Sequence, residues 1–521
     1  MNLPKSENKN LRLFTTMFFT GMAFVVNFLI SLFLVPYISK NMCTDAYGFV
    51  SLAINFVNYA AVFTTALNSY ASRFITVEYH KGNRENAGRY FSSVFFGDMF
   101  LGIFIVLIFT IITIYLDKFL DIPKGLVSDV KALFMLIFVN FFFLTIATAY
   151  GAYAQIKNHL DLVGIFKGVG SIAQVAVMVI LFSVFGANLW IVGAGYISSG
   201  LVIFFSGYFL TKKYTPDLKV KRSLFSMDAI KELVINGIWN SVSNLGNTLN
   251  TGLDLIITNV MLGSFIMGQL SYAKTIGLIF STLFNIVAFP FQPLFLKYYS
   301  DKDNEKLIGE FKFSIKVAGG VSELAFAGFM ALGFYYIKLW IPAEDTAFVY
   351  LLTIFTISSC LGEGAVSPLY YAYTLAVKNK IPCLVTVAGG VLNVAFMFIL
   401  IKFANMGVWA VVLTTVVICT LTNIIFHPIY AAKCLNVNPF TFIPDVIKHV
   451  VLCGLLTGVF AALNLVIKPE TWAGLIGAII LYSLTGAVIL FILLFGKADR
   501  KKLASFIMAK VFYKTGKGES I

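Results

Sequence analysis

The stretch "NGIWNSVSNLGNTLNTGLDLIITNVMLG", residues 236–263, is long enough to cross a bilayer, yet it carries a series of polar side chains. These polar residues recur every three or four positions: Asn236, Asn240, Asn244, Asn247, Asn250 and Asp254. At about 100° per residue they share one face of an α-helix, within an arc of roughly 120°. The other faces carry leucine, isoleucine and valine. The stretch therefore predicts a membrane helix with one polar side.

The whole chain is far more apolar than a soluble protein of its length. Of its 521 residues, 59% are hydrophobic and 12% are charged, whereas soluble domains carry about 25% charged residues. Apolar runs of at least about 20 residues are long enough to span the hydrocarbon core. They lie near 11–38, 46–75, 91–116, 131–156, 162–185, 188–211, 233–261, 265–297, 312–338, 348–376, 381–403, 406–432, 447–467 and 472–496. Because these runs lack a long alternating pattern, we predict an all-α integral membrane protein with about 14 transmembrane helices.

The distribution of basic residues predicts how the chain is oriented. Its net charge is +14, with 39 Lys and Arg residues against 25 Asp and Glu. When the predicted spans are followed in order, most of the basic residues fall on one side of the membrane. Basic loops collect on the cytoplasmic side, so both termini are predicted to be cytoplasmic. The surplus is then an orientation signal with some affinity for anionic membrane lipids, and we predict no nucleic-acid partner.

One long polar loop divides the first twelve predicted helices into two sets of six. The loop is "TKKYTPDLKVKRSLFSMDAIKE", residues 211–232. A faint repeat relates the two sets, because Gly48, Ser51 and Ala53 in "YGFVSLA" have the spacing of their counterparts in "MGQLSYA", residues 267–273. We predict a parallel repeat, with a six-helix bundle over 1–211, a linker over 212–232, a second bundle over 233–432, and helices 13 and 14 with a basic tail over 433–521.

Several ionisable residues fall inside the predicted spans: Asp98, Asp254, Lys274, Glu323 and Glu363. A charged group at the bilayer centre costs at least about 2.5–3.5 kcal/mol, so such groups usually line a cavity. Asp254 and Lys274 flank a short turn at similar depth, and they either serve transport or form a structural ion pair. Glu323 is expected near the cytoplasmic end of its helix, where water would solvate it. We interpret Asp254, Asp98 and Glu363 as candidates for ion coupling.

The asparagine face has two interpretations. Asparagines hydrogen-bond neighbouring membrane helices at about 0.6 kcal/mol per contact, which accounts for one or two of them. A whole polar face instead favours a water-filled cavity, whose amide donors and acceptors suit a hydroxyl-rich substrate. We assign Asn236, Asn240, Asn244, Asn247 and Asn250 to this cavity.

Basic side chains near the predicted inner surface are candidates for binding an anion. Arg12 begins the first predicted span, Arg73 closes the second, and Lys274 lies within the eighth. Guanidinium groups bind phosphate in a bidentate manner. Positive-inside placement alone would also put arginines there, so both interpretations stay open.

The sequence contains no signature of an enzyme. There is no P-loop, no His-Glu-x-x-His and no Gly-x-Ser-x-Gly. The six cysteines show no Cys-x-x-Cys spacing, which predicts neither disulfides nor a metal site. Of the four histidines, His427 is the one expected near membrane depth, as a packing residue beside Pro428. We predict no catalytic residue, no metal and no bound cofactor.

Two stretches resemble the bacterial flippases that move repeat units of O-antigen, capsule and exopolysaccharide. "TALNSYASRFITVEYHKGN", residues 65–83, is similar to their small-x-x-x-Arg-Phe-Ile, Tyr, Lys-Gly signature. "GLDLIITNVMLGSFIMGQLSYAKTI", residues 252–276, is similar to their hairpin of helices seven and eight. These flippases form the polysaccharide transport family, in the same superfamily as the MATE multidrug exporters and the lipid II flippases.

This resemblance implies a fold and a mode of action. The fold would be a pair of six-helix bundles, exchanging between inward- and outward-open states. The substrate would be undecaprenyl-diphosphate carrying an oligosaccharide, driven by an H⁺ or Na⁺ gradient. By position, Arg73 matches the helix-two arginine of the family, Asp254 the helix-seven acid and Lys274 a basic helix-eight site. The lipid II flippases line their cavity with several arginines, and this chain has few at membrane depth.

We therefore predict a flippase in the bacterial cytoplasmic membrane, with Arg12, Arg73 and Lys274 at the diphosphate. Its partners would be the lipid-linked oligosaccharide, membrane lipids and a polysaccharide polymerase, and the protein itself would be a monomer. The main alternative is a cation-coupled multidrug exporter of the MATE type. A lipid II flippase and a membrane glycan ligase are further alternatives.

Overall fold

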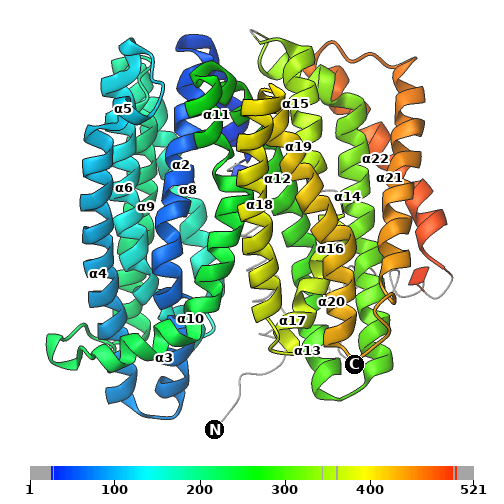
Figure 1. Cartoon of the computed structure of the whole chain (residues 1–521). Coiled ribbons are helices and arrows are strands. Elements are labelled where there is room, and N and C mark those ends of the chain that lie inside the picture. The colour runs from blue at the N-terminus through cyan, green and yellow to red at the C-terminus, as the bar shows by residue number, and fades with distance from the viewer. Residues whose placement is uncertain (1–24, 27, 343, 360–361, 497–498, 501–521) are drawn as a thin grey trace, which may run out of the picture. The chain divides into compact units, whose positions relative to one another are not determined.

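The computed structural model describes residues 25–26, 28–342, 344–359, 362–496 and 499–500 (Figure 1). These residues form helices joined by short turns, without a strand among them. The prediction of an all-α protein is therefore confirmed for the described chain. Arg12, one of the predicted diphosphate contacts, lies outside the described residues.

The first half of the chain forms long helices connected by tight turns. In order they are Phe28–Asn41, α2 (Thr44–Asn68), α3 (Ala71–His80), α4 (Arg84–Ile114), α5 (Leu116–Phe119), α6 (Val127–Tyr150), α7 (Ala152–Ile156), α8 (Leu160–Phe185) and α9 (Trp190–Tyr214). α6 packs against both α4 and α9, and the three helices run side by side in Figure 1. Asn83 begins α4 as an N-cap, because its side chain accepts a hydrogen bond from the backbone of Asn86.

The second half is also helical, with more interruptions of its helices. Its elements are α10 (Met227–Asn247), the π-helical turn η3 (Thr248–Gly252), α11 (Asp254–Leu262), α12 (Ser264–Ala288), α13 (Gln292–Ser300), α14 (Asn304–Trp340), α15 (Thr346–Ser358), α16 (Glu363–Val366), α17 (Tyr370–Leu375), α18 (Lys380–Ala404), α19 (Val408–Leu421), the π-helical turn η6 (Thr422–Phe426), α20 (His427–Cys434), α21 (Ile443–Asn464) and α22 (Trp472–Leu494). Short 3₁₀ turns occur at Pro290 and Pro368. Proline disrupts a helix there because it lacks an N–H and its ring crowds the preceding turn.

Twelve helices among the described residues are long and apolar enough to cross a membrane. The segment from α10 to α11 is as long as the helices among the twelve. It is not one of them because the asparagine face lowers its mean hydropathy. The described part of the first helix, Phe28–Asn41, is shorter. Together they agree with the predicted set of about 14 helices.

The described residues form two compact units. The first unit contains the chain up to Thr275 together with 380–415, and the second contains 276–379 and the chain from Val416 onward. Each unit thus combines segments from different parts of the sequence. The linker predicted at 212–232 separates the two halves of the predicted repeat, and this division stays a prediction.

Positions related by the sequence repeat meet inside the first unit. A Cβ added to Gly48 of α2 would lie 3.0 Å from the Cα of Gly268, its counterpart on α12. A Cβ on Gly268 would lie 2.4 Å from the carbonyl oxygen of Thr44. The Tyr47 hydroxyl bonds the Thr275 hydroxyl at 2.6 Å beside this contact. Gly48 and Gly268 are thus in close contact, and the parallel repeat itself stays a prediction.

The two last helices extend the second unit. α21 and α22 pack on α14 through a cluster of buried side chains that includes Leu332, Leu456 and Tyr482. The opposite side of α22 exposes Leu484, Val488 and Ile492. An apolar helix with one packed side and one exposed apolar side is typical of a lipid-facing position.

Candidate functional site

The polar face of α10 packs closely against α2. A Cβ on Gly237 would lie 2.0 Å from the carbonyl oxygen of Ala66, so only glycine fits there. The Ser241 hydroxyl donates to the carbonyl of Val62. One turn later, the Asn244 amide donates to the Thr65 hydroxyl at 2.8 Å. Small and hydroxyl residues let the two backbones approach, as is usual between membrane helices.

The five asparagines of this face have different surroundings. Besides Asn244, Asn250 makes an interhelical bond, since its amide donates to the Thr386 carbonyl of α18 at 3.0 Å. Asn236 donates to a carbonyl of its own helix. The side chains of Asn240 and Asn247 make no hydrogen bond with any described residue. Asn244 and Asn250 thus make the interhelical contacts that the sequence left open, and the cavity role stays a prediction for all five asparagines.

The helix then changes to the π-helical turn η3, where the Leu253 N–H bonds the carbonyl of Thr248. Three consecutive carbonyls here accept side chains from three different helices. The carbonyl of Asn250 accepts from Asn393 of α18 at 2.6 Å, and that of Thr251 accepts from Lys274 of α12 at 3.0 Å. The carbonyl of Gly252 accepts from the Tyr59 hydroxyl of α2 at 2.5 Å. The signal for this break was present in the sequence as "NTLNTG", which is a poor helix former.

Such π turns occur often at functional sites, because they open backbone carbonyls to other partners. Irregular backbone at membrane depth is tolerated where it is buried in protein or lines a polar cavity. The turn η3 meets this condition by bonding to α2, α12 and α18.

Asp254 and Lys274 meet directly beside this turn. Their side chains form an ion pair between the first residue of α11 and the middle of α12. The Asp254 side chain is 1% exposed and that of Lys274 is 19% exposed. The second carboxylate oxygen of Asp254, Oδ1, has no partner among the described residues. The predicted proximity is confirmed, and the ammonium keeps part of its surface open to another anion.

The other two predicted coupling acids make hydrogen bonds of their own. Asp98 of α4 is fully buried, and its carboxylate accepts from the Asn68 amide at 2.9 Å. Glu363 begins α16 in the second unit and accepts from the Ser281 hydroxyl at 3.1 Å. Neither contact tests a role in ion coupling, which stays a prediction.

Arg73 is an exposed residue of α3 in the first unit. Its guanidinium carbon lies 6.0 Å from the centre of the Tyr70 ring. Among the described residues it has no carboxylate within ion-pair distance. The side chain is thus available to an anion, and its predicted diphosphate contact remains to be tested.

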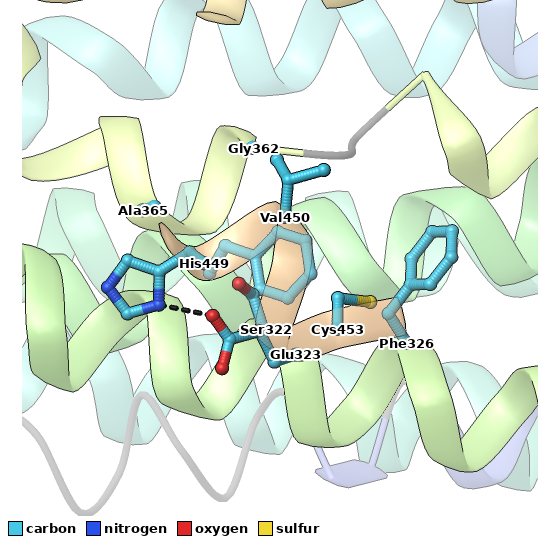
Figure 2. Close-up of a pocket in the computed structure, with 9 residues that line it drawn as sticks. Ser322, Glu323, Phe326, Gly362, Ala365, His449, Val450 and Cys453 are labelled. Carbon is cyan, nitrogen blue, oxygen red and sulfur yellow. Dashed lines mark hydrogen bonds and ion pairs between the residues drawn. The ribbon is translucent and has the colours of Figure 1, made fainter. Parts of the chain in front are cut away.

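One polar site was not predicted from the sequence, and one of its members lies in an environment other than the predicted one. Glu323 was expected to be solvated, but its side chain is 3% exposed and pairs with His449 of α21 (Figure 2). The expectation was wrong because α21 covers that side of α14. His427 was also not alone at depth, since His449 is buried within α21, whose predicted span of 447–467 included it.

A network of hydrogen bonds ties the loop before α6 to the turn between α11 and α12. The Asn259 side chain accepts from the Asp121 N–H at 2.9 Å and donates to the Asp121 carbonyl at 3.1 Å. The Asp121 carboxylate in turn accepts from the Ser264 N–H at 3.1 Å. Gly263 makes the turn possible with a φ of 95°. The network fixes the hairpin that presents both Asp254 and Lys274.

We expect Asn259→Ala to lower the free energy of unfolding by about 1–3 kcal/mol, because it removes both bonds from a fully buried side chain. Equilibrium unfolding of the purified protein in a mild detergent measures this effect. Val260→Ala is a matched control, since Val260 is exposed and its truncation should change stability by at most about 0.5 kcal/mol. Equal stability of the two variants would contradict a role for the network.

Comparison with known proteins places this geometry in a family. The uncharacterized membrane protein EpsK of Bacillus subtilis (strain 168) is 26% identical over 493 residues, which cover 95% of this chain and 96% of that protein. The fold matches the lipid II flippase MurJ in an inward closed conformation, with a TM-score of 0.69 at 15% identity, covering 92% of this chain and 98% of that one. It also matches an inward-facing multidrug resistance MATE family transporter of the MOP superfamily, with a TM-score of 0.59 at 14% identity, covering 82% of this chain and 98% of that one. The model of the family described as polysaccharide biosynthesis protein matches residues 13–298, more than half of the chain. The chain, a multi-span membrane protein, therefore belongs to the polysaccharide biosynthesis protein family.

Proposed function

We propose that this protein is a flippase that moves an undecaprenyl-diphosphate-linked oligosaccharide from the cytoplasmic to the outer leaflet. Transport would proceed by alternating access, powered by an H⁺ or Na⁺ gradient. The protein would act in the bacterial cytoplasmic membrane with both termini inside, as a monomer supplying a polysaccharide polymerase.

The observation that carries this proposal is the polar break in the helix from α10 to α11. The π turn η3 would destabilise a membrane helix unless the backbone carbonyls that it frees bond to other groups. Here the turn adjoins the buried pair of Asp254 and Lys274, in a chain of the polysaccharide biosynthesis protein family. A polar site at this depth suits a substrate whose head group must cross the hydrocarbon core.

The residues available to the head group match its chemistry. Asn240 and Asn247 have amides without partners among the described residues, which suits sugar hydroxyls. Lys274 has a partly exposed ammonium, so a diphosphate can compete with Asp254 for it. Arg73 would supply the bidentate contact to a phosphate. Release of Asp254 from Lys274 would then link substrate binding to the binding of a cation.

The lipid part of such a substrate needs apolar surroundings. The second unit contains a cavity of about 340 Å³ lined by side chains of α12, α14, α21 and α22. Its walls are mainly aromatic and aliphatic, among them Phe280, Phe329 and Phe460. This volume and lining suit several isoprene units, which supports a lipid-linked substrate.

The test uses proteoliposomes with a lipid-linked oligosaccharide in the inner leaflet and a glycosidase added outside. We expect time-dependent cleavage that exceeds that of empty liposomes. Arg73→Ala should slow it about tenfold, since a charged hydrogen bond contributes about 1.5–3 kcal/mol and each 1.4 kcal/mol is a factor of ten. Asp254→Asn should slow it through the loss of cation binding.

Arg222→Ala is the matched control, because Arg222 is also an exposed arginine but lies in the loop of residues 211–232. It removes the same charge and should leave the rate of cleavage unchanged. Normal flipping by both Arg73→Ala and Asp254→Asn would refute the assigned residues. No cleavage by the wild-type protein, across the plausible glycans and ion gradients, would favour the drug-export alternative.

A further inference from the structure

An acid–base pair joins α14 to α21 in the interior of the second unit. Nδ1 of His449 and Oε1 of Glu323 are in hydrogen-bonding contact, and their side chains are 4% and 3% exposed (Figure 2). A Cβ on Gly319, one turn before Glu323, would lie 2.5 Å from the same imidazole nitrogen. The absence of a side chain at position 319 thus leaves room for the imidazole ring between α14 and α21.

One oxygen of the pair is left without a partner. Oε2 of Glu323 makes no hydrogen bond with any described residue. A cavity of about 20 Å³ adjoins it, with Ser322, His449 and Cys453 among its lining residues (Figure 2). A volume of at least about 10–15 Å³ holds one water molecule. The site therefore combines groups that bind a proton with space for the water that would exchange it.

Two other charged groups near the pair, Lys448 and Glu363, have partners of their own among the described residues. Lys448, the neighbour of His449, directs its ammonium to the carbonyl of Leu493 at 3.1 Å. Glu363 bonds Ser281, and Nδ1 of His427 bonds the Tyr373 hydroxyl at 2.8 Å. Other titratable groups on these elements include Cys453, Lys433 and Lys316, of which Lys316 pairs with Asp499. His449 is thus the group that hydrogen-bonds Glu323, and Lys448 adds a weaker electrostatic attraction.

We propose that Glu323 and His449 form a proton-binding site that couples proton movement to the transport cycle. Its place in the cycle rests on the proposed flippase function, whereas proton binding itself does not. With one proton shared between Nδ1 and Oε1, the pair has no net charge and fits a dry interior. Release of that proton to the adjacent water leaves a carboxylate among Phe284 and Phe326, which favours hydration of the cavity. The protonation state thereby selects between dry and hydrated packing of α14 against α21.

The first experiment needs no substrate. Cys453 lines the cavity, so its alkylation by N-ethylmaleimide reports hydration in a full-length chain whose other cysteines are serine. The rate is compared with that of the same chain carrying Glu323→Gln, which can still hydrogen-bond the imidazole but cannot ionise. Both chains contain the same thiol, and a negative charge on Glu323 disfavours its thiolate, so a rise of the rate ratio with pH reports hydration rather than titration of the thiol. We expect the ratio of the parent rate to the Glu323→Gln rate to rise about threefold to tenfold between about pH 6 and about pH 9.

A ratio that does not change with pH would overturn the proposal and leave a structural hydrogen bond. Glu310→Gln is the matched control, because Glu310 is another buried acid of α14 that does not line the cavity. It should leave the pH dependence of the parent chain in place. His449→Gln is the second variant, and it should also abolish the rise.

The transport arm uses the same liposomes with an imposed pH gradient. We expect the gradient to accelerate glycan flipping by the wild-type protein, and Glu323→Gln to remove about nine-tenths of that acceleration, a tenfold effect. Equal acceleration of both proteins would overturn the coupling role. If the wild-type protein flips no glycan at all, the proposed function fails, and the alkylation experiment still decides whether the pair binds a proton.

Discussion

Replacing Lys274 with methionine is expected to destabilise the protein by about 3–5 kcal/mol. The reason is that Asp254, 1% exposed, would remain buried without its charged partner. Methionine preserves most of the lysine stem, so the change removes the ammonium and little of the packing. The yield of folded protein and the midpoint of thermal unfolding in detergent measure the effect.

The double variant Asp254→Leu/Lys274→Met separates the two interpretations of this pair. Replacing a buried ion pair by apolar residues is often neutral or even stabilising, so the double variant should regain the lost stability. We expect it nevertheless to flip no glycan, because both the cation site and the diphosphate contact are gone. A double variant that is stable and transports at the wild-type rate would show that the pair is only structural.

Gly268→Val is the second substitution with a large expected effect. The new Cβ would lie 2.4 Å from the Thr44 carbonyl oxygen, and a backbone atom cannot move aside as a side-chain end can. Overpacking of this kind costs about 1–3 kcal/mol. We expect α2 and α12 to be held apart at this contact, and glycan flipping to fall at least about tenfold, because alternating access needs this contact to close.

Gly168→Val is the control for the intrinsic cost of valine in a membrane helix. A Cβ at Gly168 of α8 meets nothing within 4 Å, so flipping should be preserved. Cys43, directly before Thr44, reports the separation when it is the remaining cysteine in the chain. A membrane-impermeant maleimide should modify it faster in Gly268→Val than in Gly168→Val. Equal modification and equal flipping would contradict the closure role of the contact.

The helical architecture was predictable because it depends on local properties. The length and hydropathy of each run decide whether it spans the membrane, so the predicted run 472–496 corresponds to α22 at Trp472–Leu494. The pairing of Asp254 with Lys274 was also within reach, since a short turn joins their helices. Local spacing similarly indicated the polar face of α10, although it did not show which asparagines bond to α2 and α18.

The site that the sequence did not reveal depends on contacts between distant segments. Glu323 and His449 are far apart in the chain, and each occurs as a single polar residue in an apolar run. Their meeting depends on α21 covering one side of α14, which hydropathy does not encode. The same holds for the π turn η3, whose three carbonyls are stabilised by Tyr59, Lys274 and Asn393 from three other helices.

An α-helical membrane protein with a polar helix and a faint repeat follows from the sequence alone. Apolar length, charge placement and periodicity act within one segment and can be read from it. The tertiary structure alone decided that Gly48 meets Gly268, that Asn244 and Asn250 bond to neighbouring helices, and that Glu323 is buried against His449. These outcomes depend on which helix faces are brought together, and that choice minimises unpaired polar groups over the whole chain rather than within any one segment.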